Sequence, residues 1–253
     1  MYKEELRDKK KLITTKDGTK TLFSMEFNEA YHSIKDGALT ESLEKHIKPA
    51  LSLQKNKEKL VILDICFGLG YNTLSTLYYI KKYNLETKIE IISPELDIGL
   101  IKSLKTFEYP KEFNQFQNII NELSSNLYYE DTQFKIEILI GDARNIVPQI
   151  DKKIDILYQD AFSPKHNPLL WTKEYFADIR ALSKKDTIIT TYSVASAVRM
   201  GLYENGYNIF LLKGKNVRSS IVASLSMLDL KSIDIEVKYP IAKHLVIKKT
   251  KKS

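Results

Sequence analysis

Short apolar runs alternate with longer mixed segments along most of the chain, and this alternation predicts the fold. Five runs rich in apolar and β-branched residues predict buried parallel strands, at residues 60–65, 89–93, 134–140, 154–158 and 187–191. The segments between them are long enough for helices that cross back over a sheet, and a polar helical insertion at 109–129 delays the third strand. Two later runs, 207–212 and 220–225, predict a closing antiparallel pair. We therefore expect an α/β fold with a doubly wound, mostly parallel sheet of seven strands and one antiparallel edge strand.

The first 55 residues precede this pattern and predict a small N-terminal arm. Residues 12–15 and 19–23 flank Asp17 and Gly18, a pair typical of a hairpin turn. A helix is expected from about Thr40, a good N-cap residue, to Leu53. An arm in this position could cover a binding cleft. We expect three parts, namely a hairpin and helix packed on the core (1–55), the sheet domain (56–230) and a basic C-terminal tail (231–253).

Composition indicates a globular protein but does not indicate a particular function. The chain has 253 residues, 43% hydrophobic and 28% charged, as a globular domain does. No apolar run approaches the roughly 20 residues that span a bilayer, and the charged N-terminus has no signal-peptide core, so a cytoplasmic location is expected. A single cysteine and four histidines without ligand spacing predict no metal site. A monomer is favoured.

Positive charge raises the possibility of a nucleic-acid partner. The net charge is +7, with lysines gathered near both ends of the chain and basic residues close together at 213–218. RNA is a plausible partner for such a protein. A lysine-rich composition with no such partner explains the same excess, so charge supports RNA binding without establishing it.

Acidic residues follow four consecutive predicted strands, at Asp64, Glu95, Asp142 and Asp160. The carboxyl ends of parallel strands lie at one edge of a sheet, so four carboxylates would face one crevice. Carboxylates suit the amino group, ribose hydroxyls and exocyclic amine of an aminoacyl nucleoside, whereas they repel a diphosphate. This favours S-adenosyl-L-methionine over NAD as cofactor. Each acid taken alone is also consistent with a helix cap or a solvated turn.

Two loops at these strand ends carry further signals. Gly68 and Gly70 allow a ligand close to the backbone, but Thr73 stands where the dinucleotide fingerprint requires a third small residue, so this signal is weak. Asp160 is followed by Phe162 and Pro164, a combination that suits an amine held by a carboxylate and contacted by a ring. An ordinary turn capped by aspartate remains the alternative.

The chain resembles the class I S-adenosyl-L-methionine-dependent methyltransferases, and within them the MnmC-like family that modifies the wobble uridine of tRNA. The resemblance covers about residues 12–225 and is carried by the segments 29–33, 67–72, 92–95, 141–142, 160–164, 167–172, 193–206 and 213–218. The most specific block is Asp-x-Phe-x-Pro followed by Asn-Pro-x-x-Trp-Thr. Cys66 departs from it, since the family has glycine there. The fused flavin oxidoreductase of two-domain members is expected to be absent.

The resemblance implies a Rossmann-like fold and a set of site residues. It implies a cofactor pocket made of Asp64, Phe67, Gly68, Gly70, Asn72, Glu95, Asp142 and Ala143, with Glu95 at the ribose and Asp142 at the adenine. Asp160 would hold the substrate amine, the 5-aminomethyl group of a tRNA wobble uridine, and would orient it and stabilise the ammonium rather than act as a general base. The proton would leave to water or through Tyr158.

Several other side chains are candidates for substrate contacts. Phe162 would pack against the substrate, Tyr31 and His32 would form a lid, and Arg199, Lys213 and Arg218 would contact phosphates. Core positions for the first pair and a solvated basic face for the last three are the alternatives. Trp171 is expected in the core and Cys66 as a small apolar filler. A small-molecule amine methyl- or aminopropyltransferase is the main rival function, and an RNA-binding module without activity is a second.

Overall fold

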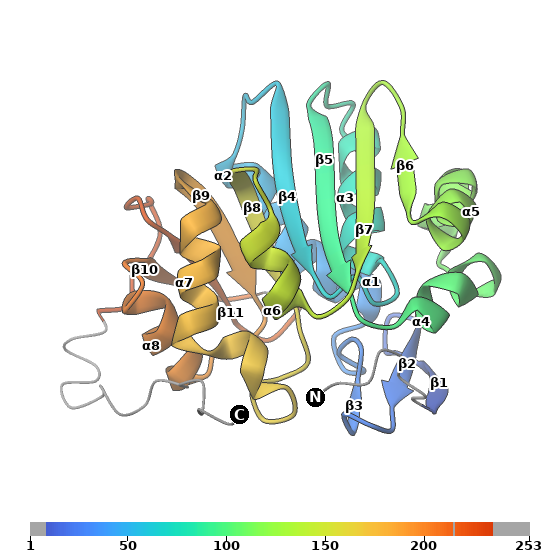
Figure 1. The fold of residues 1–253 in the computed structure, drawn as a ribbon, viewed down its shortest axis with the longest axis horizontal. Helices are drawn as coiled ribbons and strands as arrows, with labels where there is room; N and C mark the ends of the chain where they lie inside the picture. Colours follow the sequence, from blue (N-terminus) through green and yellow to red (C-terminus); the bar gives the residue numbers. More distant parts are fainter. Residues whose placement is uncertain (1–8, 215, 235–253) are drawn as a thin grey trace.

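An eight-stranded mixed sheet forms the centre of the molecule in the computed structural model, which describes residues 9–214 and 216–234 (Figure 1). The strand order is β10-β11-β9-β8-β4-β5-β7-β6. The strands are β4 Lys59–Ile65, β5 Lys88–Glu95, β6 Tyr128–Glu130, β7 Phe134–Ile140, β8 Ile154–Gln159, β9 Ser183–Thr191, β10 Asn208–Leu212 and β11 Ser220–Ser224. The five central strands run parallel to one another, and they are β7, β5, β4, β8 and β9. The chain adds β5 and β7 on one side of β4 and then β8 and β9 on the other, so the switch point at which open α/β sheets bind ligands lies between β4 and β8.

The predicted fold class is confirmed, and two details of the sheet differ from expectation. The antiparallel strand β11 lies between β9 and β10 instead of at the edge. The eighth strand is β6, a short antiparallel edge strand paired with β7. It forms because Leu127 adopts a left-handed conformation (φ 61°) at the end of the preceding helix and turns the chain back beside β7. A three-residue strand has too short a pattern to be recognised in the sequence.

Helices cover both faces of the sheet. They are α1 Ala38–Glu41, α2 Lys48–Leu53, α3 Tyr71–Lys82, α4 Ile98–Ser103, α5 Gln117–Asn126, α6 Ala143–Ile146, α7 Lys173–Leu182 and α8 Ser196–Tyr203. A π-helical segment, η1 (Ser42–Ile47), joins α1 to α2, and short 3₁₀ turns occur at η2 Leu104–Thr106, η3 Lys111–Phe116, η4 Val147–Gln149 and η5 Pro168–Trp171. The helical insertion expected at 109–129 is therefore η3, α5 and the start of β6.

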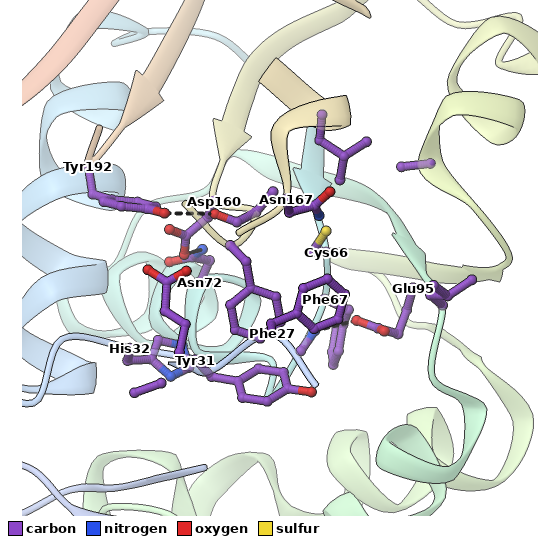
Figure 2. A pocket seen from close by; sticks show the side chains of 18 of the residues that line it. Phe27, Tyr31, His32, Cys66, Phe67, Asn72, Glu95, Asp160, Asn167 and Tyr192 are labelled. Atoms are coloured by element: carbon purple, nitrogen blue, oxygen red, sulfur yellow. Dashed lines mark hydrogen bonds between the residues drawn. The ribbon is translucent and has the colours of Figure 1, made fainter. Parts of the chain in front are cut away.

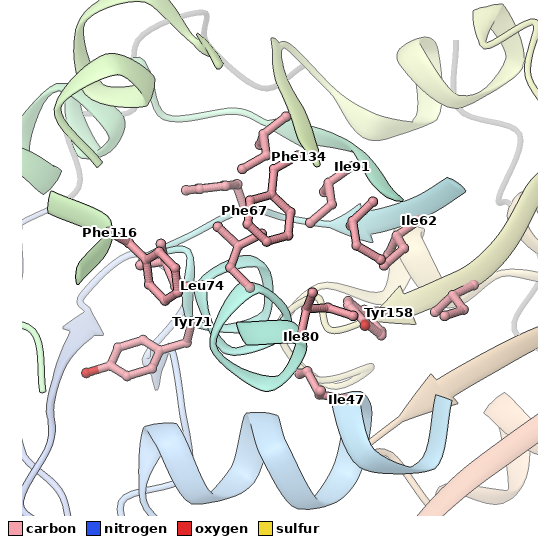
Figure 3. Close-up of a cluster of buried hydrophobic side chains, with 14 of the residues drawn as sticks. Ile47, Ile62, Phe67, Tyr71, Leu74, Ile80, Ile91, Phe116, Phe134 and Tyr158 are labelled. Carbon is pink, nitrogen blue, oxygen red and sulfur yellow. The ribbon is translucent and has the colours of Figure 1, made fainter. Parts of the chain in front are cut away.

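Each central strand contributes to two separate cores because successive side chains point to opposite faces. Ile62 of β4 packs with α3 and η1 on one face, in the cluster that Figure 3 shows. The next residue, Leu63, packs with α6, α7 and α8 on the other face. The strands are buried on both sides, which is why they read as continuous apolar runs.

The N-terminal arm is a three-stranded antiparallel sheet, β1 Lys10–Thr14, β2 Lys20–Ser24 and β3 Glu29–Ala30, followed by the α1–η1–α2 segment. The hairpin prediction is confirmed, but the helix begins at Ala38 and Thr40 is not its N-cap. The Asp17 carboxylate accepts a hydrogen bond from the Thr40 amide at 3.0 Å and so caps the helix from the hairpin. Gly37 is needed there because a Cβ would lie 2.0 Å from the Asp17 carboxyl carbon. The basic tail expected at 231–253 lies mostly outside the described residues.

Candidate active site

The arm and the carboxyl ends of the central strands enclose one cavity of about 360 Å³. A cavity of this size is in the range of cofactor and small-molecule sites. Residues 27 and 29–35 of the arm line one side, and the loops that follow β4, β5, β7 and β8 line the other (Figure 2). Lys10 of β1 forms an ion pair with Asp97 at 2.5 Å, which attaches the arm to the loop after β5. The expectation that the arm covers a cleft is confirmed.

Three of the four strand-end acids line this cavity, and Asp64 does not. Asp64 is still inside β4, and its side chain points under α3, where the Thr73 hydroxyl donates to it at 2.9 Å. It is 1% exposed, and burial raises its pKa to about 7. Three carboxylates therefore line the cavity, and the fourth, that of Asp64, is buried beneath α3.

Glu95 shapes the loop that follows β4 at the cavity. Its two carboxylate oxygens accept hydrogen bonds from the Gly68 and Asp97 amides, each at 2.8 Å. Burial raises the pKa of Glu95, although the amide hydrogen bonds partly offset this. Gly68 has φ 56°, a conformation that favours glycine, and a Cβ there would lie 3.2 Å from the Tyr31 ring, which would have to shift to accommodate it.

The remaining predicted cofactor residues divide into two groups. Phe67, Asn72 and Ala143 line the cavity, whereas Gly70 lies outside its lining as the N-cap of α3 (φ 73°). A Cβ on Gly70 would lie 2.8 Å from the Phe67 ring, so its role is to let α3 start beneath that ring.

Asp142 caps α6 and is paired with a basic residue that the sequence did not single out. Its carboxylate accepts from the Arg144 amide at 2.9 Å and from the Arg144 Nε at 3.0 Å. Arg144 also lines the cavity. The acid at this end of the cavity is therefore largely neutralised, and the guanidinium beside it adds hydrogen-bond donors.

Asp160 lies at the other end of the cavity, held from two sides. The Asn72 amide donates to its Oδ2 at 2.7 Å, and Nε2 of His46 lies 3.4 Å from its Oδ1. Burial alone would raise the pKa of Asp160, but the charge and hydrogen bonding of His46, with His32 and Asn72, lower it overall. Asp160 is therefore a carboxylate that remains charged in a largely enclosed site. No ligand or catalytic pattern in the sequence pointed to His46.

Aromatic rings cover the cavity beside Asp160. Phe27 stacks on Phe162 with ring centroids 4.6 Å apart, and Tyr31 contacts Phe162 edge-on at 4.9 Å. The Ser163 amide donates to Glu29 at 2.9 Å, which fixes the loop after β8 against the arm. Tyr31 and Phe162 thus lie where they were expected, while Phe27 and Glu29 were missed because nothing local relates the arm to β8. His32 also lines the cavity, and burial lowers its pKa.

Of the three basic residues expected to contact phosphates, the structure brings only Arg218 to the cavity. Its guanidinium donates to Ser33 Oγ at 3.3 Å at the rim. Arg199 is 8% exposed on α8 and donates to Ser196 at 3.4 Å, so burial argues against a phosphate contact. Lys213 is exposed but outside the cavity lining. Exposed Lys35 lines the rim instead.

Three further residues refine the expectations. Tyr158 is fully buried and lies 3.1 Å from Thr76 Oγ1, so burial argues against the proton route expected through it. Trp171 is in the core, as predicted, and donates to the Phe162 carbonyl at 2.8 Å. Cys66 lines the cavity with φ 66°, a conformation that favours glycine, and burial raises the pKa of its thiol. It is thus part of the cavity wall rather than a core filler.

Two kinds of feature are absent from the described residues. No group of three or more histidine, cysteine or acidic side chains is arranged to hold a metal ion in that part of the chain. Within the same residues, no helix has both the length and the apolar character needed to cross a bilayer.

Several known proteins are similar to this chain in sequence or in fold. Residues 107–226 match a family model described as S-adenosyl-L-methionine-dependent methyltransferase. An uncharacterized protein of Methanocaldococcus jannaschii is 31% identical over 209 residues, which are 81% of this chain and 56% of that protein. The tRNA 5-methylaminomethyl-2-thiouridine biosynthesis bifunctional protein MnmC of Campylobacter jejuni subsp. doylei is 29% identical over 86% of this chain and 36% of its own length. The chain thus spans about half the length of the first relative and about a third of the length of the second.

A solved structure is similar over nearly the whole chain. The crystal structure of MnmC2 from Aquifex aeolicus superimposes with a TM-score of 0.85 at 29% identity, covering 98% of this chain and 81% of that one. The family model, the relatives and the shared fold show that the chain is similar to the S-adenosyl-L-methionine-dependent methyltransferases and to MnmC.

Proposed function

We propose that this chain transfers a methyl group from S-adenosyl-L-methionine to the amine of a 5-aminomethyl group on the wobble uridine of tRNA. The observation that carries the proposal is Asp160, a charged carboxylate that Asn72 holds in the wall of the cavity. A carboxylate so placed suits a substrate that presents an ammonium. This function implies a cytoplasmic location.

Another part of the cavity wall fits the cofactor. Gly68 leaves room against the backbone, and each oxygen of Glu95 accepts one amide hydrogen bond, which leaves acceptor capacity for ribose hydroxyls. Asp142, Ala143 and Arg144 would border the adenine. S-adenosyl-L-methionine, when bound there, would supply a methyl group on a positively charged sulfur for transfer to an amine. The roles of Asp160 are to orient the amine and stabilise its positive charge.

Features of the rim suit a nucleotide rather than a free amine. The rings of Phe27, Tyr31 and Phe162 offer a stacking surface for a base turned into the cavity. Arg218 and Lys35 at the rim place positive charge where flanking phosphates would pass. The relative MnmC is named for the biosynthesis of 5-methylaminomethyl-2-thiouridine in tRNA.

Incubation with labelled S-adenosyl-L-methionine and bulk tRNA from a strain lacking the modification tests the proposal. Nucleoside mass analysis should show a 5-aminomethyl uridine gaining one methyl group. Asp160→Asn should lose transfer by at least about 100-fold while cofactor binding, measured by calorimetry, persists. Asp151→Asn is the matched control, because Asp151 is exposed and outside the cavity. Transfer to free alkylamines but not to tRNA would favour the small-molecule alternative.

A further inference from the structure

A fully buried histidine lies directly behind the proposed amine site. His46 is 0% exposed, and its Nδ1 lies 2.9 Å from the Thr190 hydroxyl of β9. Its Nε2 faces Asp160 Oδ1 at 3.4 Å and has no hydrogen bond of normal length within the described residues. A buried ring nitrogen aimed at a carboxylate that itself faces the cavity is an arrangement that needs an explanation.

The backbone that carries His46 is also unusual. His46 belongs to η1, a six-residue π-helical segment between α1 and α2. π-Helical turns are rare and occur frequently at functional sites, because the wider turn changes the direction of a side chain. Here the turn directs the imidazole inward, between Thr190 on β9 and Asp160 after β8. Two contacts from different elements thus fix the ring.

The chemistry of the proposed reaction requires a proton acceptor. An alkylamine has a pKa of roughly 10 and reaches the site as an ammonium, which has no lone pair to accept a methyl group. Asp160 is a weak base, since its pKa is lowered. An imidazole is ordinarily a stronger base than a carboxylate by about 2.6 pH units, so it holds such a proton better.

We propose that His46 is a positioning residue that works through Asp160 and takes up the proton released by the substrate ammonium; this inference rests on the proposed function. In the Nδ1–H tautomer the ring donates to Thr190, and Nε2 carries a lone pair toward Asp160. The ammonium N–H bond breaks, its proton passes to an Asp160 oxygen and on to Nε2, and the nitrogen keeps the electron pair. That pair then forms the bond to the methyl group, and the imidazolium stays paired with the Asp160 carboxylate.

Other titratable groups surround this pair and contribute to any pH dependence. His32 of the arm interacts electrostatically with both His46 and Asp160. Asp64 of β4 interacts with His46, and the Tyr158 ring of β8 lies 5.9 Å from the imidazole. His46 itself contacts Asp160 at 3.4 Å, so replacement of His46 alone tests its own contribution.

The pH profile of His46→Gln distinguishes a proton acceptor from a structural residue. Glutamine keeps a polar group near Asp160 but cannot take up a proton. At about pH 7.5 single-turnover methyl transfer to aminomethyl-uridine tRNA should fall about 100-fold. The loss should shrink by close to tenfold per pH unit toward about pH 9.5, as more substrate arrives unprotonated. Thr190→Val should give a smaller loss of the same kind. His166→Gln, outside the cavity, is the matched control and should behave as wild type.

A loss by the same factor at every pH would overturn the proposal. A second measurement needs no substrate, because NMR can follow the carboxyl carbon of Asp160 in the free protein. Its titration midpoint should move to higher pH in His46→Gln, since the protonated form of His46 lowers the pKa of Asp160. An unchanged midpoint would contradict the pairing. If wild type methylates no tRNA but this midpoint moves, the proposed substrate fails and the His46–Asp160 pair stands.

Discussion

Replacement of Asp64 by asparagine is expected to stabilise the protein increasingly as the pH rises. Asp64 is 1% exposed, and a single hydroxyl, that of Thr73, donates to it at 2.9 Å. Its Oδ1 has no hydrogen-bond partner within the described residues. A charge in this position is poorly compensated, so burial raises the pKa of the carboxyl group from 3.8 to about 7.

The size of the effect follows from this difference in pKa. Between the two values the folded protein holds a proton that the unfolded chain releases, so the free energy of unfolding falls as the pH rises through that window. About three pKa units correspond to about 4 kcal/mol at 1.36 kcal/mol each, of which roughly two thirds falls between about pH 5 and about pH 8. Asparagine has no charge to bury and escapes this loss.

Asp155 provides a control of opposite sign. It is equally buried at 1% exposure, but Lys184 and Lys57 lie 2.8 Å from its Oδ1 and the Val61 amide donates to Oδ2 at 2.9 Å. Burial would raise its pKa, yet these partners lower it overall. Its stabilising contribution is present above the ordinary pKa and lost as the pH falls through the lowered one. Asp155→Asn should therefore destabilise the protein at neutral pH by about 1–3 kcal/mol.

Urea unfolding of wild type and the two variants at several pH values measures these differences. The gap between Asp64→Asn and wild type should widen with pH in favour of the variant, whereas Asp155→Asn should remain below wild type at neutral pH. A gap that stays constant from about pH 5 to about pH 8 would refute the reasoning. It would mean that Asp64 is solvated, or paired with a group that compensates its charge.

Three further predictions concern the cavity. Cys66→Gly should raise the free energy of unfolding by about 1 kcal/mol, because glycine adopts the left-handed conformation at φ 66° without strain. A lowered melting temperature would contradict this expectation. Phe162→Ala should raise the Michaelis constant for tRNA about three- to tenfold through loss of stacking with Phe27; an unchanged constant would exclude the aromatic cluster from substrate binding. Arg218→Ala should reduce the slope of log affinity against log salt by about one, measured by filter binding, and an equal slope would remove it from the phosphate contacts.

The sequence alone determined the framework of the protein. Apolar runs of strand length, separated by helix-length segments, fix a doubly wound sheet because each strand must be buried on both faces. The same strand pattern predicts that acids at the strand ends lie together, and Glu95, Asp142 and Asp160 do line one cavity. Local pattern suffices for such features because the carboxyl ends of parallel strands share an edge regardless of the details of packing.

Only the tertiary structure decided which side chains face the cavity. Asp64 differs from Asp160 by lying one residue inside its strand, so its side chain turns under α3. His46, Phe27 and Glu29 come from the arm, far along the chain from the strand ends that they meet. Their positions depend on how the arm packs over the sheet, which involves contacts between distant segments that no local pattern encodes. Arg199 is buried, whereas Arg218 lies at the rim of the cavity. Only a basic residue that packing leaves at the surface can contact phosphate, and the sequence does not tell which of the two this is.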